Sequence, residues 1–130
     1  MNVVDSSGWL EYLADGPGAD FFAPALEQVE SLVVPTIVLL EVGRVVLRQR
    51  GEEAALQAMA LLEQASLAEL DAGLARSAVA LGAAHRLPLA DSIILATARA
   101  FDAELWTQDA DFKGIAGVHY LAKVQPASEP

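Results

Sequence analysis

The chain has 130 residues, enough for one domain with a sizeable core, and 54% of them are hydrophobic. It contains no cysteine, which excludes a disulfide framework, a thiolate zinc site and a cysteine nucleophile. Its formal net charge of -10 repels phosphate backbones, so nucleic-acid binding would require metal ions or local arginines to reverse the field. The same charge favours a basic protein partner.

The N-terminus has neither the basic region nor the long apolar core of a signal peptide. The most apolar stretch, Leu32 to Leu47, is interrupted by Pro35, Glu41 and Arg44, which makes it too broken for a membrane span. We therefore expect a soluble, cytoplasmic protein that does not associate with a membrane.

The first half of the chain is predicted to contain two strands and four helices. The second strand is β-branched and apolar, as expected for a strand covered on both faces of a sheet. Ser6 or Ser7 is predicted to cap the first helix and Thr36 the third, because their hydroxyls can accept backbone hydrogen bonds. We expect the third helix to be largely buried and Leu56 of the fourth to face inward. In chain order, the elements are strand 2–5, helix 6–14, helix 19–30, strand 32–35, helix 36–50 and helix 52–64.

The second half continues the alternation, beginning with an edge strand over 66–70. Asp71 is predicted to cap helix 72–86, and a further helix carries Asp91 in an apolar stripe. Strands 104–107 and 118–121 follow. This order predicts the α/β class, as a three-layer α/β/α sandwich with a central parallel sheet. We expect a single domain over residues 1–122 and a flexible C-terminal tail over 123–130.

Four carboxylates are predicted to meet at one edge of this sheet. Asp5 ends the first strand, and Asp109 follows the fourth. Glu41 lies about one turn into the helix after the second strand, and Asp91 begins the helix before the fourth. Sites in such sheets lie beyond the carboxyl ends of the strands, and helical side chains lean toward the helix N-terminus. Carboxylates this close together repel one another, and divalent cations are the usual reason that such clusters are tolerated.

Ligation by oxygen alone, without His or Cys, suits Mg²⁺ or Mn²⁺ rather than zinc. One or two such ions, about 4 Å apart when both are bound, can activate water and stabilise the leaving oxygen of a phosphodiester. The cluster therefore predicts metal-assisted hydrolysis.

Four segments together resemble PIN domains, and in size and layout the VapC-type toxin ribonucleases. They are the strand ending in Asp5-Ser6-Ser7, Glu41 within PTIVLLEVGRVV, Asp91 within LPLADSIILATA, and the segment TQDADF from Thr107 to Phe112. The resemblance covers the chain up to the tail. It implies a PIN-like fold and a Mg²⁺- or Mn²⁺-dependent endoribonuclease.

The resemblance also implies which residues bind the metal and activate water. Thr107 matches a position that orients the acidic cluster, and Asp111 and Ser6 match auxiliary positions. The residues that match the family's catalytic and metal-binding acids are Asp5, Glu41, Asp91 and Asp109.

The implied partners are an RNA substrate, a second copy of the chain in a homodimer, and a cognate antitoxin whose basic segment enters the acidic crevice. The protein would then be the toxin of a type II toxin–antitoxin pair. Its candidates for contacting RNA phosphate are Arg44, Arg48 and Arg99.

Each acidic residue also has an ordinary structural interpretation. Asp5 could extend the cap of the first helix, and Glu41 could pair with Arg44 across one helical turn. Asp91 could be stabilised at a helix N-terminus, and Asp109 could be a turn residue. Two other functions stay open: a metal-dependent phosphoryl-transfer or receiver-like module, and a catalytically silent PIN-like interaction domain.

Overall fold

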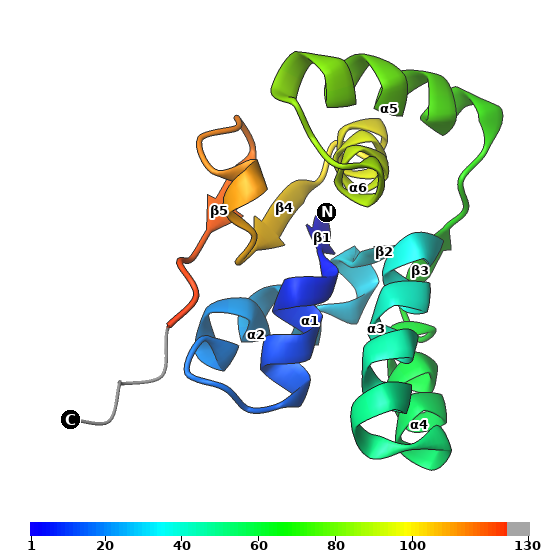
Figure 1. Cartoon of the computed structure of the whole chain (residues 1–130), viewed down its shortest axis with the longest axis vertical. Coiled ribbons are helices and arrows are strands. Elements are labelled where there is room, and N and C mark those ends of the chain that lie inside the picture. Colours follow the sequence, from blue (N-terminus) through cyan, green and yellow to red (C-terminus); the bar gives the residue numbers. More distant parts are fainter. Residues whose placement is uncertain (125–130) are drawn as a thin grey trace.

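Short parallel strands form the centre of the fold in a computed structural model that describes residues 1–124 (Figure 1). In one part of the sheet, β4 (Glu104–Thr107) lies between β1 (Asn2–Val4) and β5 (Val118–Tyr120). In the other, β2 (Val33–Pro35) pairs with β3 (Ser66–Ala68). A parallel bridge between Asn2 and Leu32 joins the two parts, which gives the order β5-β4-β1-β2-β3.

Helices cover both faces of these strands, as parallel connections require. Figure 1 shows α5 and α6 on one side and α1 and α2 on the other. The predicted α/β/α sandwich with a central parallel sheet is therefore confirmed. The helices are α1 (Ser6–Leu13), α2 (Ala19–Glu27), α3 (Thr36–Arg50), α4 (Glu52–Leu62), α5 (Ala72–His85) and α6 (Leu89–Ala100), with 3-10 helices η1 (Val29–Ser31) and η2 (Ala110–Phe112).

The most buried helix is α6, which packs against β1, β2 and β4. Every residue from Ser92 to Ala98 is buried, and this confirms the apolar stripe predicted around Asp91. Among residues 1–124, no single helix is long and apolar enough to cross a membrane. Together, α5 and α6 have the length and apolar composition of a membrane span, but the pair is bent by 113°.

The caps of two helices differ from the prediction. Asp5, rather than Ser6 or Ser7, caps α1, because its carboxylate accepts the Gly8 N–H at 3.1 Å. Both serines are already helical, so neither can occupy the cap position. The predicted capping role of Asp71 is confirmed, since its side chain accepts the N–H of the third residue of α5 at 2.8 Å.

The cap of α3 is Pro35, and Thr36 is the first helical residue. The φ of Pro35, −61°, already matches the helical value, so the helix can begin without a side-chain cap. The predicted helix 19–30 is also interrupted, at Gln28, where ψ is 70°. The chain then continues as η1.

Helices α3 and α4 are more exposed than predicted. Leu40 and Leu47 of α3 are 56% and 52% exposed, and Leu56 of α4 is 63% exposed. The two helices pack on each other beyond the sheet, so one side of each lacks a second layer (Figure 1). In the predicted tail, residues 125–130 lie outside the described part of the chain, and the domain boundary at residue 122 stays a prediction.

Candidate metal centre and active site

Acidic side chains gather at the carboxyl edge of the sheet. Asp5 directly follows β1, and Asp109 lies two residues after β4. Asp91 is in the first turn of α6, where the partial positive charge of the helix N-terminus favours a carboxylate. Glu41 reaches this edge from α3, and Asp111 from η2.

The tightest group consists of Asp91, Asp109 and Asp111. One carboxylate oxygen from each lies within 4.8 Å of the others. Asp109 caps η2, and its Oδ1 accepts the Asp111 N–H at 2.9 Å, which fixes the two residues relative to each other. Asp111, expected from sequence to be auxiliary, therefore lies in the closest acidic group.

Asp5 is held beside this group by three hydrogen-bond donors. It is only 2% exposed. Ser7 Oγ and the Gly8 N–H donate to Oδ1 at 2.6 and 3.1 Å, and Thr107 Oγ1 donates to Oδ2 at 2.6 Å. Thr107 Oγ1 also accepts the Asp109 N–H at 2.8 Å. One buried hydroxyl thus connects Asp5 with the backbone of Asp109.

Glu41 contributes a carboxylate with one unpartnered oxygen. Its Oε1 is buried and has no hydrogen-bond partner among residues 1–124. The ordinary alternative, an ion pair with Arg44, does not form within residues 1–124. Burial raises the pKa of Glu41, the Ser6 hydroxyl partly lowers it, and the charge of Asp109 raises it further.

The pKa values of two aspartates also reflect the crowding. Burial raises the pKa of Asp5 to about 6, although the hydrogen bonds from Ser7 and Thr107 favour the ionised form. Burial, the charge of Asp109 and a hydrogen bond with that carboxylate raise the pKa of Asp91 to about 8. A cation bound beside these carboxylates would favour their ionised forms.

The group fits a divalent cation of the kind that prefers oxygen ligands. Its donors are all carboxylate oxygens, and no Lys or Arg forms an ion pair with them within residues 1–124. Asp91, Asp109 and Asp111 are close enough together to hold one ion. The unpartnered oxygen of Glu41 offers a further ligand or a proton acceptor.

The three predicted RNA-contacting arginines are not brought together. Arg44 and Arg48 line a cavity of about 370 Å³ with Ser6 and Glu41, next to the acidic group. Arg99 lies in the last turn of α6, at the opposite end of that helix from Asp91. Its guanidinium donates instead to a backbone carbonyl that precedes β5, at 3.0 Å.

The sequence patterns did not identify Ser7 and Gln108 as residues of the site. Ser7 Oγ donates to Asp5 and accepts the Gln108 N–H at 3.0 Å, which links the start of α1 to the end of β4. The sequence signal for Ser7, a hydroxyl two residues after an aspartate, also occurs at ordinary helix starts. It could not distinguish Ser7 from the neighbouring Ser6.

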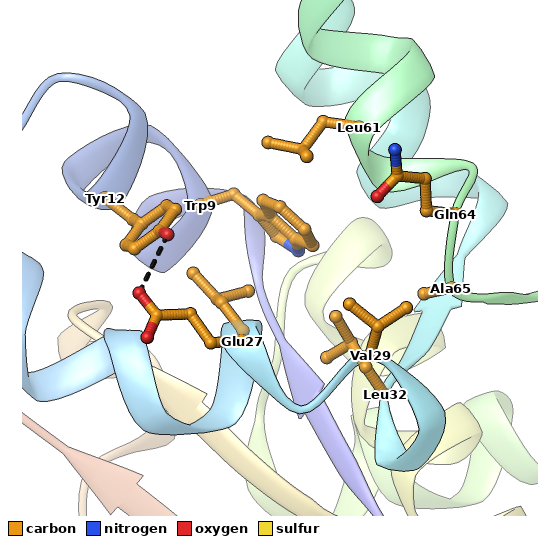
Figure 2. Close-up of a pocket in the computed structure, with 9 residues that line it drawn as sticks. Trp9, Tyr12, Glu27, Val29, Leu32, Leu61, Gln64 and Ala65 are labelled. Atoms are coloured by element: carbon orange, nitrogen blue, oxygen red, sulfur yellow. Dashed lines mark hydrogen bonds between the residues drawn. The ribbon is translucent and has the colours of Figure 1, made fainter.

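A separate cavity of about 190 Å³ lies between α1, the α2–η1 segment and the end of α4 (Figure 2). The buried Trp9 lines it, and its indole N–H has no hydrogen-bond partner among residues 1–124. On another wall, the Tyr12 hydroxyl donates to Glu27 at 3.0 Å. No residue of the acidic group lines this cavity, so it does not belong to the candidate site.

Solved structures share this fold over nearly their whole length. A toxin–antitoxin complex from Klebsiella pneumoniae contains a chain with 25% identity and a TM-score of 0.77; the match covers 92% of this chain and 96% of that one. The Mycobacterium tuberculosis toxin VapC20, described as cleaving the sarcin–ricin loop, has 19% identity and a TM-score of 0.71; the match covers 89% of this chain and 95% of that one. A chain of VapBC2 from Rickettsia felis, bound to a DNA fragment of its promoter, has 16% identity and a TM-score of 0.70; the match covers 93% of this chain and 97% of that one.

At these identities, the last two likenesses show the fold alone. Among curated proteins, none matches the sequence. The sequence model of the PIN domain family, however, matches residues 3–118, a range that contains β2, β3, β4 and the whole acidic group and overlaps β1 and β5. The chain therefore belongs to the PIN domain family.

Proposed function

We propose that this protein is a metal-dependent endoribonuclease that hydrolyses RNA phosphodiester bonds, and that it is the toxin of a type II toxin–antitoxin pair. The approach of Asp91, Asp109 and Asp111 to within 4.8 Å carries the enzymatic part of the proposal. Membership of the PIN family and the likeness to a chain of a toxin–antitoxin complex support the toxin part.

The proposed cofactor is Mg²⁺ or Mn²⁺, because the site offers oxygen ligands only. When bound, such an ion supplies a water of lowered pKa and stabilises negative charge on the phosphate. Asp91, Asp109 and Asp111 bind the ion. Asp5, held by Ser7 and Thr107, adds negative charge beside them and fixes the backbone of Asp109 through Thr107.

Glu41 is the proposed proton acceptor of the reaction. Its buried Oε1 has no partner that would compete for a proton, and its raised pKa makes it a stronger base than an exposed glutamate. Arg44 and Arg48, which line the neighbouring cavity, contact the RNA phosphates. Their positive charge opposes the repulsion expected from the net charge of -10.

The proposed protein partners are a cognate antitoxin and a second copy of the chain. A basic antitoxin segment would neutralise the acidic group in place of the ion and so block the reaction. Exposed leucines on α3 and α4, among them Leu40, Leu47 and Leu56, offer an apolar surface for a homodimer. As an enzyme acting on RNA, the protein would work in the cytoplasm.

Cleavage of RNA by the purified protein tests the enzymatic proposal, with Mn²⁺, Mg²⁺ or EDTA present. The test variant is Asp91→Asn. Its matched control is Asp20→Asn, which changes an exposed aspartate in the first turn of α2. We expect metal-dependent fragments from the wild type and the control but not from Asp91→Asn. Asp91→Asn should fold, since it removes repulsion from Asp109. Equal cleavage by both variants would exclude Asp91 from the reaction. No cleavage by folded wild type with either ion would support a silent interaction domain instead.

A further inference from the structure

A cavity of about 440 Å³ lies between α1 and α3, directly beside the acidic group. Ser6, Ser7 and Gln108 contribute to its wall. Ser7 is hydrogen-bonded to both Asp5 and the Gln108 N–H, and Gln108 immediately precedes Asp109. The cavity therefore opens next to the residues that hold the proposed catalytic carboxylates in place.

The lining combines apolar and amide side chains. Its apolar members are Leu10, Leu13, Ala14, Val45 and Val46. Gln49 is exposed and makes no side-chain hydrogen bond within residues 1–124, so its amide can both donate and accept. A nucleobase needs this combination, since it has apolar faces and a hydrogen-bonding edge.

The carboxylate in the lining, Glu11, is already satisfied. Its Oε2 accepts the Gly18 N–H at 2.9 Å and Gln108 Nε2 at 3.0 Å. These bonds hold Glu11 against the wall. Two side-chain amides line the cavity, those of Gln49 and Gln108. The Gln108 amide donates to Glu11, so within the described chain Gln49 is the one without a hydrogen-bond partner.

Positively charged side chains line this cavity and the one that adjoins it. Arg50 and Lys123 line the cavity between α1 and α3. Arg44 and Arg48 line the 370 Å³ cavity, which shares Ser6 and Val45 with it. Four of the chain's eight Lys and Arg residues thus lie along two adjoining cavities. None of the four forms an ion pair within residues 1–124, so their charges are available to phosphates.

We propose that the cavity between α1 and α3 binds an unpaired nucleobase of the RNA substrate. Gln49 hydrogen-bonds the edge of the base, and Arg50 and Lys123 contact the flanking phosphates. This inference rests on the proposed nuclease function and deepens it by naming the cavity and the side chains that hold one base of the RNA. A paired base is turned inward in a duplex and presents neither its faces nor its full edge to a protein cavity.

Fluorescence anisotropy with labelled oligo-A, oligo-C, oligo-U and a short RNA duplex tests this inference. Asp91→Asn serves as the background, with Mg²⁺ present, so that the RNA stays uncleaved. Added to it, Arg50→Gln should weaken binding of all single strands about fivefold and reduce the salt dependence by about one phosphate contact. Gln49→Ala should change the ratio of affinities among the single strands by about threefold or more. The control, Arg76→Gln, alters an exposed arginine on α5 that lines neither cavity and should change nothing.

Unchanged affinities and base preference in Gln49→Ala and Arg50→Gln would overturn the base site, as would equal affinity for the duplex. Cleavage by the wild-type protein separates this result from failure of the nuclease proposal. Metal-dependent cleavage together with unchanged binding would overturn the base site and leave the nuclease standing. Absence of both cleavage and oligonucleotide binding would overturn both.

Discussion

Replacing Thr107 by Val tests whether the buried hydroxyl holds the acidic site together. The substitution keeps the side-chain shape and removes two hydrogen bonds, one donated to Asp5 Oδ2 at 2.6 Å and one accepted from the Asp109 N–H at 2.8 Å. Thr107 is fully buried, so water cannot replace these bonds without opening the structure. A bond to a charged group contributes about 1.5–3 kcal/mol and a neutral one about 1 kcal/mol, so the free energy of unfolding should fall by about 3 kcal/mol.

Urea unfolding of the metal-free protein, followed by circular dichroism at pH 7, measures this loss. With a typical urea dependence, about 3 kcal/mol lowers the midpoint by about 1–2 M. Thr97→Val is the matched control. Thr97 is equally buried, but its hydroxyl donates to the Ile93 carbonyl inside α6 at 2.8 Å, and that carbonyl belongs to the helix hydrogen-bond ladder. The control should lose about 1 kcal/mol or less.

The pH dependence of the same experiment identifies the carboxylate responsible. The pKa of Asp5 is about 6, so at pH 5 the group is largely protonated and the bond from Thr107 is no longer charge-assisted. The difference between Thr107→Val and Thr97→Val should therefore shrink on going from pH 7 to pH 5. Equal losses for the two variants at pH 7 would refute the assignment of Thr107 as the link between Asp5 and Asp109.

Two further predictions concern the carboxylates themselves. The pKa values of Asp5 and Asp91 are raised from 3.8 to about 6 and about 8, so the folded state binds more protons than the unfolded state between roughly pH 4 and 8. In EDTA, the stabilisation from these two groups should be complete below about pH 4 and be lost as the pH rises to 8, and Mg²⁺ should restore stability at pH 8. The urea midpoint measures this change. A midpoint that increases from pH 4 to pH 8 in EDTA would contradict the prediction. Glu41→Gln should keep the fold, which circular dichroism can check. It should slow RNA cleavage about 10²- to 10⁴-fold, because the amide cannot accept the proton. Cleavage at the wild-type rate would exclude Glu41 as the base.

Local patterns were sufficient to predict the architecture. Alternating apolar strands and helical segments predicted a parallel sheet with helices on both faces, because each element must bury its apolar side. The same patterns placed Asp5 and Asp109 beyond strand ends and Asp91 beside a buried stripe. They failed for Leu40 and Leu56, since periodicity shows which residues share a helix face but not whether another element covers it.

The sequence by itself determined the element types, the parallel sheet and the set of acidic residues near its carboxyl edge. The tertiary structure alone decided which of them touch. The register that sets Val4 beside Trp106 brings Asp5 within 2.6 Å of the Thr107 hydroxyl, 102 positions along the chain. The tertiary structure also places Arg99 away from the site and brings Asp111 into the closest acidic group. It links Ser7 to the Gln108 N–H by a hydrogen bond. Such contacts depend on strand register and helix packing, which residues distant in sequence determine jointly and which no local pattern encodes.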